Sequence, residues 1–250
     1  MISFLEHKAL AAHEIFACDL SAERRNALKR QLGVNVYSAP HTFLETMEAV
    51  FLCVKPQDLD RVLDEIEPLI TSAHLVFSIV AGRRLGGLES RLPAARIVRV
   101  MPNMPCQVSA GMSVFCLGAR CGGDDEKTTE RLLACLGKVL QLPEERFDAV
   151  TALSGSGPAF FAYVMEAMVK AGVQEGLDRS DAVQLCEQTM FGAARLMMDR
   201  GIGPHDLMQA VASPQGTTAA GLAVLEDSAL SLILQQAVAA AARRSHELSG

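Results

Sequence analysis

A change of hydrophobic pattern near residue 150 constrains the fold of this chain more than any other feature. Before it, short β-rich runs alternate with helical stretches, which is the pattern of parallel strands joined by crossover helices. From Ser154 onward, apolar residues recur at helical spacing without an intervening strand pattern. The sequence therefore predicts an α/β domain followed by an all-helical domain, with the boundary at Phe147, so that the domains are residues 1–146 and 147–250.

The elements of each half follow from its apolar runs. In the first half, strands are predicted at residues 14–18, 49–54, 75–80, 96–100 and 112–116. Helices between these strands are predicted at residues 22–32, 56–70, 85–92 and 124–136. The second half predicts only helices, with prolines at several starts and glycines at several ends, at residues 158–175, 179–200, 204–212, 218–226 and 229–248.

Composition argues against several classes of partner. The 250-residue chain is 50% hydrophobic and has a net charge of −6, so no basic surplus is left to neutralise a phosphate backbone. Its seven cysteines form no C-x-x-C pair, which predicts no metal site and indicates a reducing compartment. We see no secretory signal pattern and no apolar run that could span a bilayer. We therefore expect a cytoplasmic protein that binds neither nucleic acid nor membrane.

The helical half is unusually apolar for its size, as in residues 159–172 and 231–244. Helices of this composition cannot easily bury so much apolar surface by themselves. We expect a homodimer or higher homo-oligomer that forms through this half of the chain. The alternative is that these helices pack only against the α/β half.

Three consecutive predicted strands end in residues that could contact a ligand. Strand 49–54 runs into Lys55 and Pro56, strand 75–80 into an alanine and a glycine, and strand 96–100 into a Met-Pro-Asn-Met-Pro segment. The carboxyl ends of parallel strands form the edge where open α/β sheets bind ligands. Simpler explanations exist, since proline is common at the first position of a helix and small residues suit an ordinary turn.

Two glycine-containing segments in the second half precede helices. Residues 153–158 lead into the first helix, and residues 213–218 lead into the fourth. A helix start offers free backbone N–H groups and a positive dipole end, so the second segment could hold a carboxylate. A threonine hydroxyl there could bond a ring nitrogen. The alternatives are an interdomain hinge for the first segment and simple helix capping for the second.

The order and spacing of these motifs resemble one family. The motifs are Val-Lys-Pro after a strand, Ser-x-x-Ala-Gly, Arg-x-Met-Pro-Asn-x-Pro, Leu-Ser-Gly-Ser-Gly-Pro-Ala and Ser-Pro-x-Gly-Thr-Thr. They occur in the order and spacing of pyrroline-5-carboxylate reductases, and the resemblance covers essentially the whole chain. It implies a Rossmann-like N-terminal domain, a helical C-terminal domain that interleaves with a partner subunit, and a substrate site between the two.

The resemblance also implies which residues bind the cofactor, NADPH or NADH. The positions that match the cofactor side of the family are Asp19, Cys53, Val54, Lys55, Pro56, Ala81 and Asn103. Asp19 would favour a free ribose 2′-hydroxyl, whereas Arg24 or Arg25 could accommodate a 2′-phosphate, so both cofactors remain open. Alternatively, Asp19 only caps the next helix.

Substrate residues are implied in the same way. The positions that match the substrate side of the family are Glu144, Ser213, Gly216, Thr217 and Thr218. Thr218 is expected to bond the pyrroline nitrogen, while the backbone of residues 216–218 holds the carboxylate. Thr218 and Lys55 are the candidate catalytic residues. Their expected role is orientation, because the cofactor supplies the hydride and no protein nucleophile is needed.

The chain departs from the family near its N-terminus. Members begin with a strand and a G-x-G-x-x-G/A turn, whereas the first glycine here is Gly33 and residues 1–11 resemble the end of the first crossover helix. We expect the first strand and its diphosphate-binding turn to be missing, with neighbouring strands left unpaired. A start codon assigned too late is the simplest explanation. Pro40 and Gln215 are smaller departures, at positions where the family has asparagine and glycine.

The predicted function is NAD(P)H-dependent reduction of 1-pyrroline-5-carboxylate to L-proline, the last step of proline biosynthesis. Two alternatives remain. The missing turn favours a non-catalytic, dimerising homologue that is unable to bind a dinucleotide. The fold also suits a reductase of another small cyclic imine or hydroxy acid, because a fold alone does not fix a function.

Overall fold

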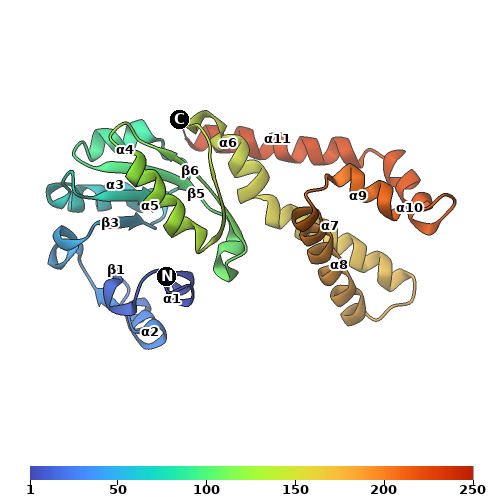
Figure 1. Ribbon diagram of the computed structural model, residues 1–250, viewed down its shortest axis with the longest axis horizontal. Coiled ribbons are helices and arrows are strands. Elements are labelled where there is room, and N and C mark those ends of the chain that lie inside the picture. Colours follow the sequence, from blue (N-terminus) through green and yellow to red (C-terminus); the bar gives the residue numbers. More distant parts are fainter. Residues whose placement is uncertain (250) are drawn as a thin grey trace. The chain divides into compact units, whose positions relative to one another are not determined.

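The protein consists of two compact units in a computed structural model that describes residues 1–249 (Figure 1). The first unit comprises residues 1–156 together with the end of the chain from Ala241, and the second comprises residues 157–240. The sequence places the boundary at Phe147 instead. The difference arises because the short helix at Phe147 and the turn after it belong to the compact first unit.

All strands of the described residues lie in the first unit. They are β1 (Phe16–Cys18), β2 (Asn35–Tyr37), β3 (Ala49–Leu52), β4 (Leu75–Ser78), β5 (Arg96–Met101), β6 (Gly111–Leu117) and β7 (Gly137–Gln141). The helices of this unit are α1 (Ile2–Glu6), α2 (Ala22–Leu32), α3 (Pro56–Ile66), α4 (Leu85–Arg91), α5 (Gly123–Ala134) and α6 (Phe147–Val150). The remaining helices are α7 (Gly157–Gln174), α8 (Arg179–Arg200), α9 (Pro204–Val211), α10 (Thr217–Glu226) and α11 (Leu230–Leu248).

A five-stranded sheet with the order β3-β4-β5-β6-β7 forms the centre of the first unit. β3, β4 and β5 run parallel, as the sequence predicts. β6 runs antiparallel to β5, which differs from the expected parallel arrangement. The connection between β5 and β6 contains the short 3₁₀ turn Met104–Val108 and no crossover helix, so the chain returns in the opposite direction.

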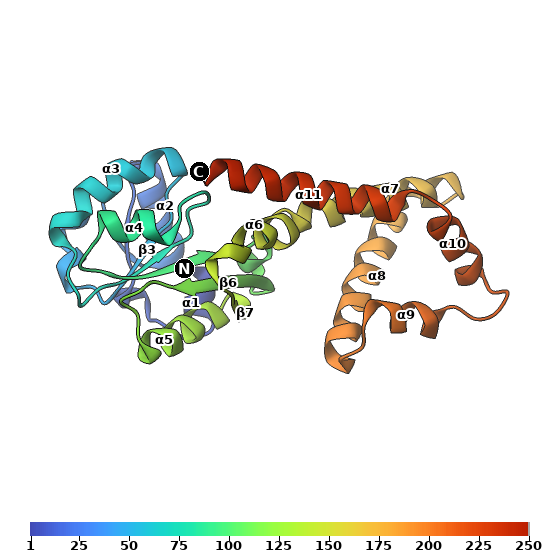
Figure 2. The ribbon, with the colours of Figure 1, turned by 90° about the horizontal axis from the view of Figure 1, so that it is seen from above.

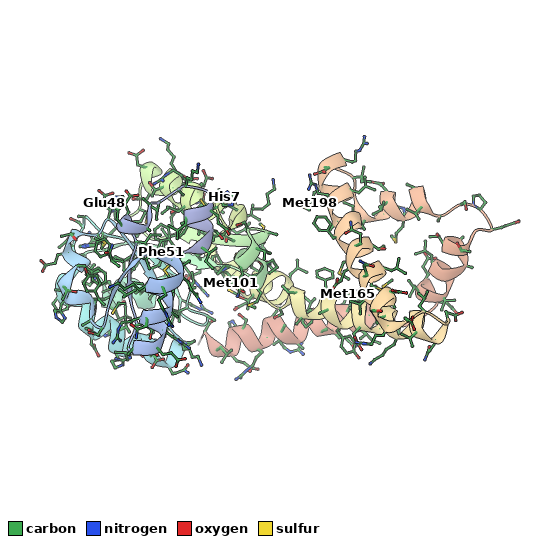
Figure 3. All side chains as sticks on the ribbon, turned by 90° about the horizontal axis from the view of Figure 1, so that it is seen from below. His7, Glu48, Phe51, Met101, Met165 and Met198 are labelled. Atoms are coloured by element: carbon green, nitrogen blue, oxygen red, sulfur yellow. The ribbon has the colours of Figure 1, made fainter. Side chains whose placement is uncertain are left out.

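The sheet is interrupted between β1 and β3, where the sequence predicts a missing strand. β1 pairs with β2 in a separate two-stranded parallel sheet, and within residues 1–249 β3 pairs only with β4. The Phe4 ring of α1 lies 5.8 Å from the Phe51 ring of β3, and Phe51 stacks on Phe77 of β4 at 4.5 Å. Phe51 is labelled in Figure 3. Aromatic packing therefore covers the apolar face beside the interruption, while that edge of β3 has no strand partner in the described residues.

Helices cover both faces of the five-stranded sheet (Figure 2). α3 and α4 pack on one face, where Leu63 and Leu88 join the core around Val76 of β4. α5 packs on the other face, where Leu132 joins the core around Phe77. Neighbouring residues of β4 point to opposite faces, and each buried side chain of this size contributes about 1.5–3 kcal/mol. The first unit is thus a three-layer α/β structure of the Rossmann-like type, with an interrupted sheet.

The second unit is a set of helices that bury little of their own apolar surface. α7 and α8 pack closely, and a Cβ atom built on Gly172 would lie 3.3 Å from the Cβ atom of Ala182. The only large hydrophobic side chain buried among the described residues of this unit is Val169. Its exposed apolar side chains include Phe161, Tyr163, Phe191, Met198 and Val224, which are 62–80% exposed. So much exposed apolar surface is typical of a surface that binds another protein.

None of the helices in residues 1–249 is, taken singly, both long and apolar enough to cross a membrane. α10 and α11 together reach the necessary length and apolar character, but the pair is bent by 57° where the two helices meet.

Candidate active site

The carboxyl ends of β3, β4 and β5 lie at one edge of the sheet, because these strands are parallel and adjacent. Cys53, Val54 and Lys55 follow β3, Ala81 follows β4, and Asn103 follows β5. The structure thus brings together, at one sheet edge, five of the cofactor residues that the family resemblance implies. Ligands of open α/β sheets bind at such an edge.

Lys55 and Pro56 form the beginning of α3. Lys55 is the N-cap residue, Pro56 occupies the first turn, and no side chain caps the free N–H groups there. Both residues are exposed. Among residues 1–249, no ion pair involves the Lys55 ammonium. The free N–H groups, the dipole of α3 and the lysine charge together favour an anionic ligand group.

Asp19 follows β1, in the separate two-stranded sheet, and its polar groups are already engaged. One carboxylate oxygen of Asp19 accepts a hydrogen bond from the Ser21 N–H at 2.7 Å. The other carboxylate oxygen lies 3.7 Å from the Arg24 guanidinium. Arg25 donates to the backbone carbonyl of Asp19 at 2.7 Å. Ser21, and not Asp19, caps α2, since its hydroxyl accepts from the Arg24 N–H. Asp19 therefore stabilises the turn before α2, and its role toward a ribose stays a prediction.

A small pocket lies at the ends of β4 and β5 within the first unit. Its volume is about 40 Å³, and its walls come from Val80–Gly82, Arg99–Met101, Thr151, Ser245 and Leu248. The carbonyl oxygen of Leu248, at the end of α11, lies 2.5 Å from where a Cβ atom of Gly82 would be. Residue 82 must therefore be glycine for α11 to end here, and the pocket has room for a few water molecules.

The end of α11 is fixed to α6 by polar contacts. Ser245 donates a hydrogen bond to one carboxylate oxygen of Asp148 at 2.6 Å, and Nδ1 of His246 lies 3.2 Å from the other. Burial acts to raise the pKa of the Asp148 carboxyl, but these two partners outweigh burial and lower the pKa. A charged Asp148 thus holds the last turn of α11 beside the pocket.

Asn103 uses both ends of its side-chain amide inside the protein. Its Oδ1 atom accepts from the Met112 N–H at 2.9 Å, and its Nδ2 atom donates to the hydroxyl and the carbonyl of Ser154 at 3.3 and 3.4 Å. Ser154 lies in a π-helical turn, Thr151–Gly155, and such turns are frequent at functional sites. Asn103 therefore joins β6 to this turn, and direct contact with a cofactor stays a prediction.

Glu144 is also engaged inside the first unit. Its Oε1 atom accepts from the Arg99 guanidinium at 2.7 Å and from the Leu85 N–H at 2.7 Å. The Arg99 guanidinium also lies 4.7 Å from the centre of the Phe147 ring. Burial, followed by the Glu144 charge, raises the pKa of the nearby Cys116 thiol to about 12. The sequence analysis includes Arg99 in the Arg-x-Met-Pro-Asn-x-Pro motif but gives it no role, although a charged residue within the apolar run of β5 is itself a signal.

The predicted substrate residues of the second unit lie at the start of α10. The Gly216 N–H donates to the Ser213 carbonyl at 3.0 Å, which closes a tight turn over residues 213–216. Gly216 is the N-cap residue of α10, and no side chain bonds the N–H groups of its first turn. A Cβ atom on Gly216 would lie 2.3 Å from the Ser213 hydroxyl. A side chain at 216 would therefore displace the Ser213 hydroxyl, and the turn leaves the backbone of Thr217 and Thr218 free to bind an anion.

Gln215 occupies a conformation that suits glycine better. Its φ angle is +61°, and it follows Pro214 at the third position of the turn, where the common proline-containing turn needs φ above zero. We expect Gln215→Gly to raise the free energy of unfolding by about 0.5–1 kcal/mol, because left-handed backbone costs a residue with a Cβ atom. Urea denaturation measures this change. Gln215→Asn should give a smaller gain in the same direction, and a loss of stability in both variants would contradict the assignment of strain.

The residues present fit the two ends of a dinucleotide. Ala81 is exposed at the end of β4, and the start of α3 offers an anion site. The first glycine along the chain, Gly33, ends α2 with φ of +66°, so it forms no turn between a strand and a helix. Which residues contact the diphosphate therefore stays a prediction.

Comparison with known proteins agrees with the two-part structure. Residues 144–248 match the family described as pyrroline-5-carboxylate reductase dimerisation, and residues 1–82 match the family described as NADP oxidoreductase, coenzyme F420-dependent. The fold and the site therefore define a nucleotide-dependent oxidoreductase with a Rossmann-like domain and a helical dimerisation domain.

Individual relatives identify the family within this class. Pyrroline-5-carboxylate reductase from Methanosarcina acetivorans is 40% identical over 88% of this chain and 82% of its own length. The enzyme of the same name from Arabidopsis thaliana is 38% identical over 90% of this chain and 82% of its own length. The chain belongs to the pyrroline-5-carboxylate reductase family.

Solved structures give the same result. A pyrroline-5-carboxylate reductase from Coxiella burnetii has a TM-score of 0.94 at 31% identity, with 100% of this chain and 93% of that chain covered. Pyrroline carboxylate reductase from Plasmodium falciparum, with NADP bound, has a TM-score of 0.87 at 28% identity, with 99% and 92% covered. The cofactor of this family is NAD(P)H, and its members act on a C=N bond.

Proposed function

We propose that this protein reduces 1-pyrroline-5-carboxylate to L-proline with NADPH or NADH. The observation that carries the proposal is the turn over residues 213–216, which presents the uncapped start of α10 with Thr217 and Thr218 at its first positions. Relatives that are 36–40% identical to it over 88–92% of its length are pyrroline-5-carboxylate reductases. The substrate carries a carboxylate and a ring nitrogen, which are the two groups that this helix start can bind.

In this proposal the substrate is bound by Ser213, Gly216, Thr217 and Thr218. The N–H groups at the start of α10 bind the carboxylate, because they have no partner in the helix and lie at its positive end. The Thr218 hydroxyl bonds the ring nitrogen and fixes the plane of the ring. Orientation of this kind lowers the barrier without a covalent step.

In this proposal the cofactor is bound by residues at the strand ends of the first unit. When bound, NAD(P)H supplies the hydride that reduces the imine carbon. Lys55 and the start of α3 bind an anionic part of the cofactor, and Ala81 allows close approach to the backbone. Lys55 is therefore a residue for cofactor binding in this proposal, and Thr218 is the residue closest to the chemistry.

We also propose that two copies of the chain associate through the second unit. The exposed side chains of Phe161, Tyr163, Phe191, Met198 and Val224 support this, as does the match to a dimerisation family. Sedimentation velocity of the purified protein should give at least a dimer at micromolar concentration. A monomer that keeps its helical circular dichroism would contradict the proposal. The seven free cysteines suit a reducing cytoplasm, which is the proposed location.

The function is tested by oxidation of NADPH and NADH with 1-pyrroline-5-carboxylate, followed beside direct binding of each cofactor. The proposal expects oxidation that depends on the substrate, with L-proline as product. Binding without oxidation would instead favour a related reductase, and a panel of other cyclic imines and hydroxy acids would then identify its substrate. Failure to bind either cofactor would favour the non-catalytic, dimerising homologue.

A further inference from the structure

Arg99 and Glu144 connect three separate segments around the pocket of the first unit. Arg99 belongs to β5 and is 7% exposed. Its Nη1 atom donates to Oε1 of Glu144, which lies in the 3₁₀ turn Glu144–Arg146 directly before α6. The same oxygen accepts from the N–H of Leu85, the first residue of α4. One carboxylate oxygen therefore ties β5, α4 and the turn before α6 to each other.

The contacts continue from this ion pair to the pocket wall. The Arg99 guanidinium lies against the ring of Phe147, and the Phe147 carbonyl accepts a hydrogen bond from the Thr151 hydroxyl at 2.7 Å. Arg99, Thr151 and residues 80–82 all line the pocket. Residues 79–84 connect β4 to α4, so the Leu85 contact fixes the far end of the segment that contains Ala81.

We propose that Arg99 and Glu144 are positioning residues that hold residues 80–84 and Thr151 in the arrangement needed for cofactor binding. This inference rests on the proposed function, in which the backbone at Ala81 contacts the cofactor. It also assigns Glu144 a different role from the direct substrate contact that the family resemblance implies. A side chain whose carboxylate oxygen already accepts two hydrogen bonds is better suited to fixing a loop than to binding a small ligand.

The chain offers a matched control on the same strand. Arg96 begins β5, at the opposite edge of the sheet, and its guanidinium pairs with Asp125 of α5. In both pairs one side chain is 8% exposed and the other is 25–31% exposed. Arg99 is the buried partner of one pair and Asp125 of the other, so Asp125→Asn controls for the loss of an ion pair on β5 without leaving a buried arginine unpaired. Of the four residues in these pairs, only Arg99 lines the pocket.

The test compares Glu144→Gln with Asp125→Asn, both of which remove the charge and keep the shape. Hydrogen exchange of residues 80–85 should be about tenfold faster in Glu144→Gln, because the neutral amide holds the arginine and the backbone N–H less strongly. Asp125→Asn should leave exchange at these residues unchanged. Equal protection of residues 80–85 in both variants and the native protein would overturn the proposal, whatever the activity of the enzyme.

Kinetics then separate positioning from a general loss of structure. Glu144→Gln should raise the KM for the cofactor about tenfold and change kcat less than twofold, since uniform binding is lost while the chemical step is kept. Arg99→Lys, which retains the charge, should be intermediate. A rise only in the KM for 1-pyrroline-5-carboxylate would make Glu144 a substrate ligand and overturn the proposal, as would faster exchange with an unchanged cofactor KM.

The two proposals fail in distinguishable ways. If the native protein neither binds nor oxidises NADPH or NADH, the proposed function fails, and the exchange experiment still decides whether the ion pair holds residues 80–85. If the native protein is active and Asp125→Asn raises the cofactor KM as much as Glu144→Gln does, the positioning role fails and the proposed function stands. If Glu144→Gln does not fold, Arg99→Lys carries the same comparison.

Discussion

Gly137→Ala should lower the free energy of unfolding by more than about 3 kcal/mol, because the added methyl group would collide with backbone atoms. Gly137 begins β7 with φ of +134° and lies opposite Gly111 of β6. A Cβ atom here would be 2.1 Å from the Gly111 carbonyl oxygen and 2.5 Å from its nitrogen. Neither atom can move without breaking the pairing of β6 with β7. Urea denaturation followed by circular dichroism measures the loss.

Gly87→Ala is the matched control for this prediction. Gly87 lies within α4, and a Cβ atom there would meet nothing within 4 Å. Alanine should therefore stabilise the helix by about 0.5–1 kcal/mol, since it loses less backbone entropy than glycine. If Gly137→Ala instead stays within about 0.5 kcal/mol of the native protein, as a neutral surface change does, then β6 and β7 do not approach as closely as described.

Thr218→Val should lower kcat/KM for 1-pyrroline-5-carboxylate by roughly 10- to 100-fold. The reason is that valine cannot form the hydrogen bond between the Thr218 hydroxyl and the ring nitrogen, where charge is present or develops during the reaction. Valine has the shape of threonine, so the packing of α10 should be kept. Binding of NADPH or NADH should not change. Steady-state kinetics with both substrates varied, together with direct cofactor binding, make the measurement.

Thr218→Ser provides the control, because it keeps a hydroxyl and loses only a methyl group. Its kcat/KM should stay within about threefold of the native value if the hydroxyl is the important group. Equal activity of Thr218→Val and the native protein would show that the ring nitrogen is bonded by another group. A loss confined to Thr218→Ser would point to the methyl group and to packing instead.

The helices were predictable because their ends carry strong local signals. α8 (Arg179–Arg200) agrees with the prediction at both ends, since Gly201 stops it with φ of +63°. α9 begins at Pro204, as predicted, because proline suits the first turn. These signals act within a few residues of each other along the chain, so the tertiary structure does not override them.

Two strands were missed for a physical reason. β2 (Asn35–Tyr37) has only three residues, with a single aliphatic side chain among them. β7 (Gly137–Gln141) lies at the edge of the sheet, and its residues are partly or fully exposed, so it needs no apolar run. Strands of this kind are defined by the partner they pair with, and a partner distant in sequence leaves no local pattern.

The sequence could predict which segments lie near each other at the site, but it could not predict the hydrogen-bond partners of individual side chains. The order of strands places Lys55 and Ala81 at one edge, and parallel pairing alone predicts this arrangement. The engagement of Asn103 with Ser154 and of Glu144 with Arg99 joins residues 45–51 positions apart. Nothing local indicates such partners, so a polar residue next to a ligand cannot be told from one that supports the loop.

The return of α11 to the first unit affects how the protein can be made and divided. The residues from Ala241 onward, which include Ser245 bonded to Asp148 and Leu248 against Gly82, are translated only after the whole of the second unit. During synthesis the first unit therefore cannot be completed until the second unit has been translated, because residues from Ala241 onward are made last. A single cut after Ser156 would not yield two complete modules, and the α/β unit would require residues 241–249 to be added in trans or by circular permutation.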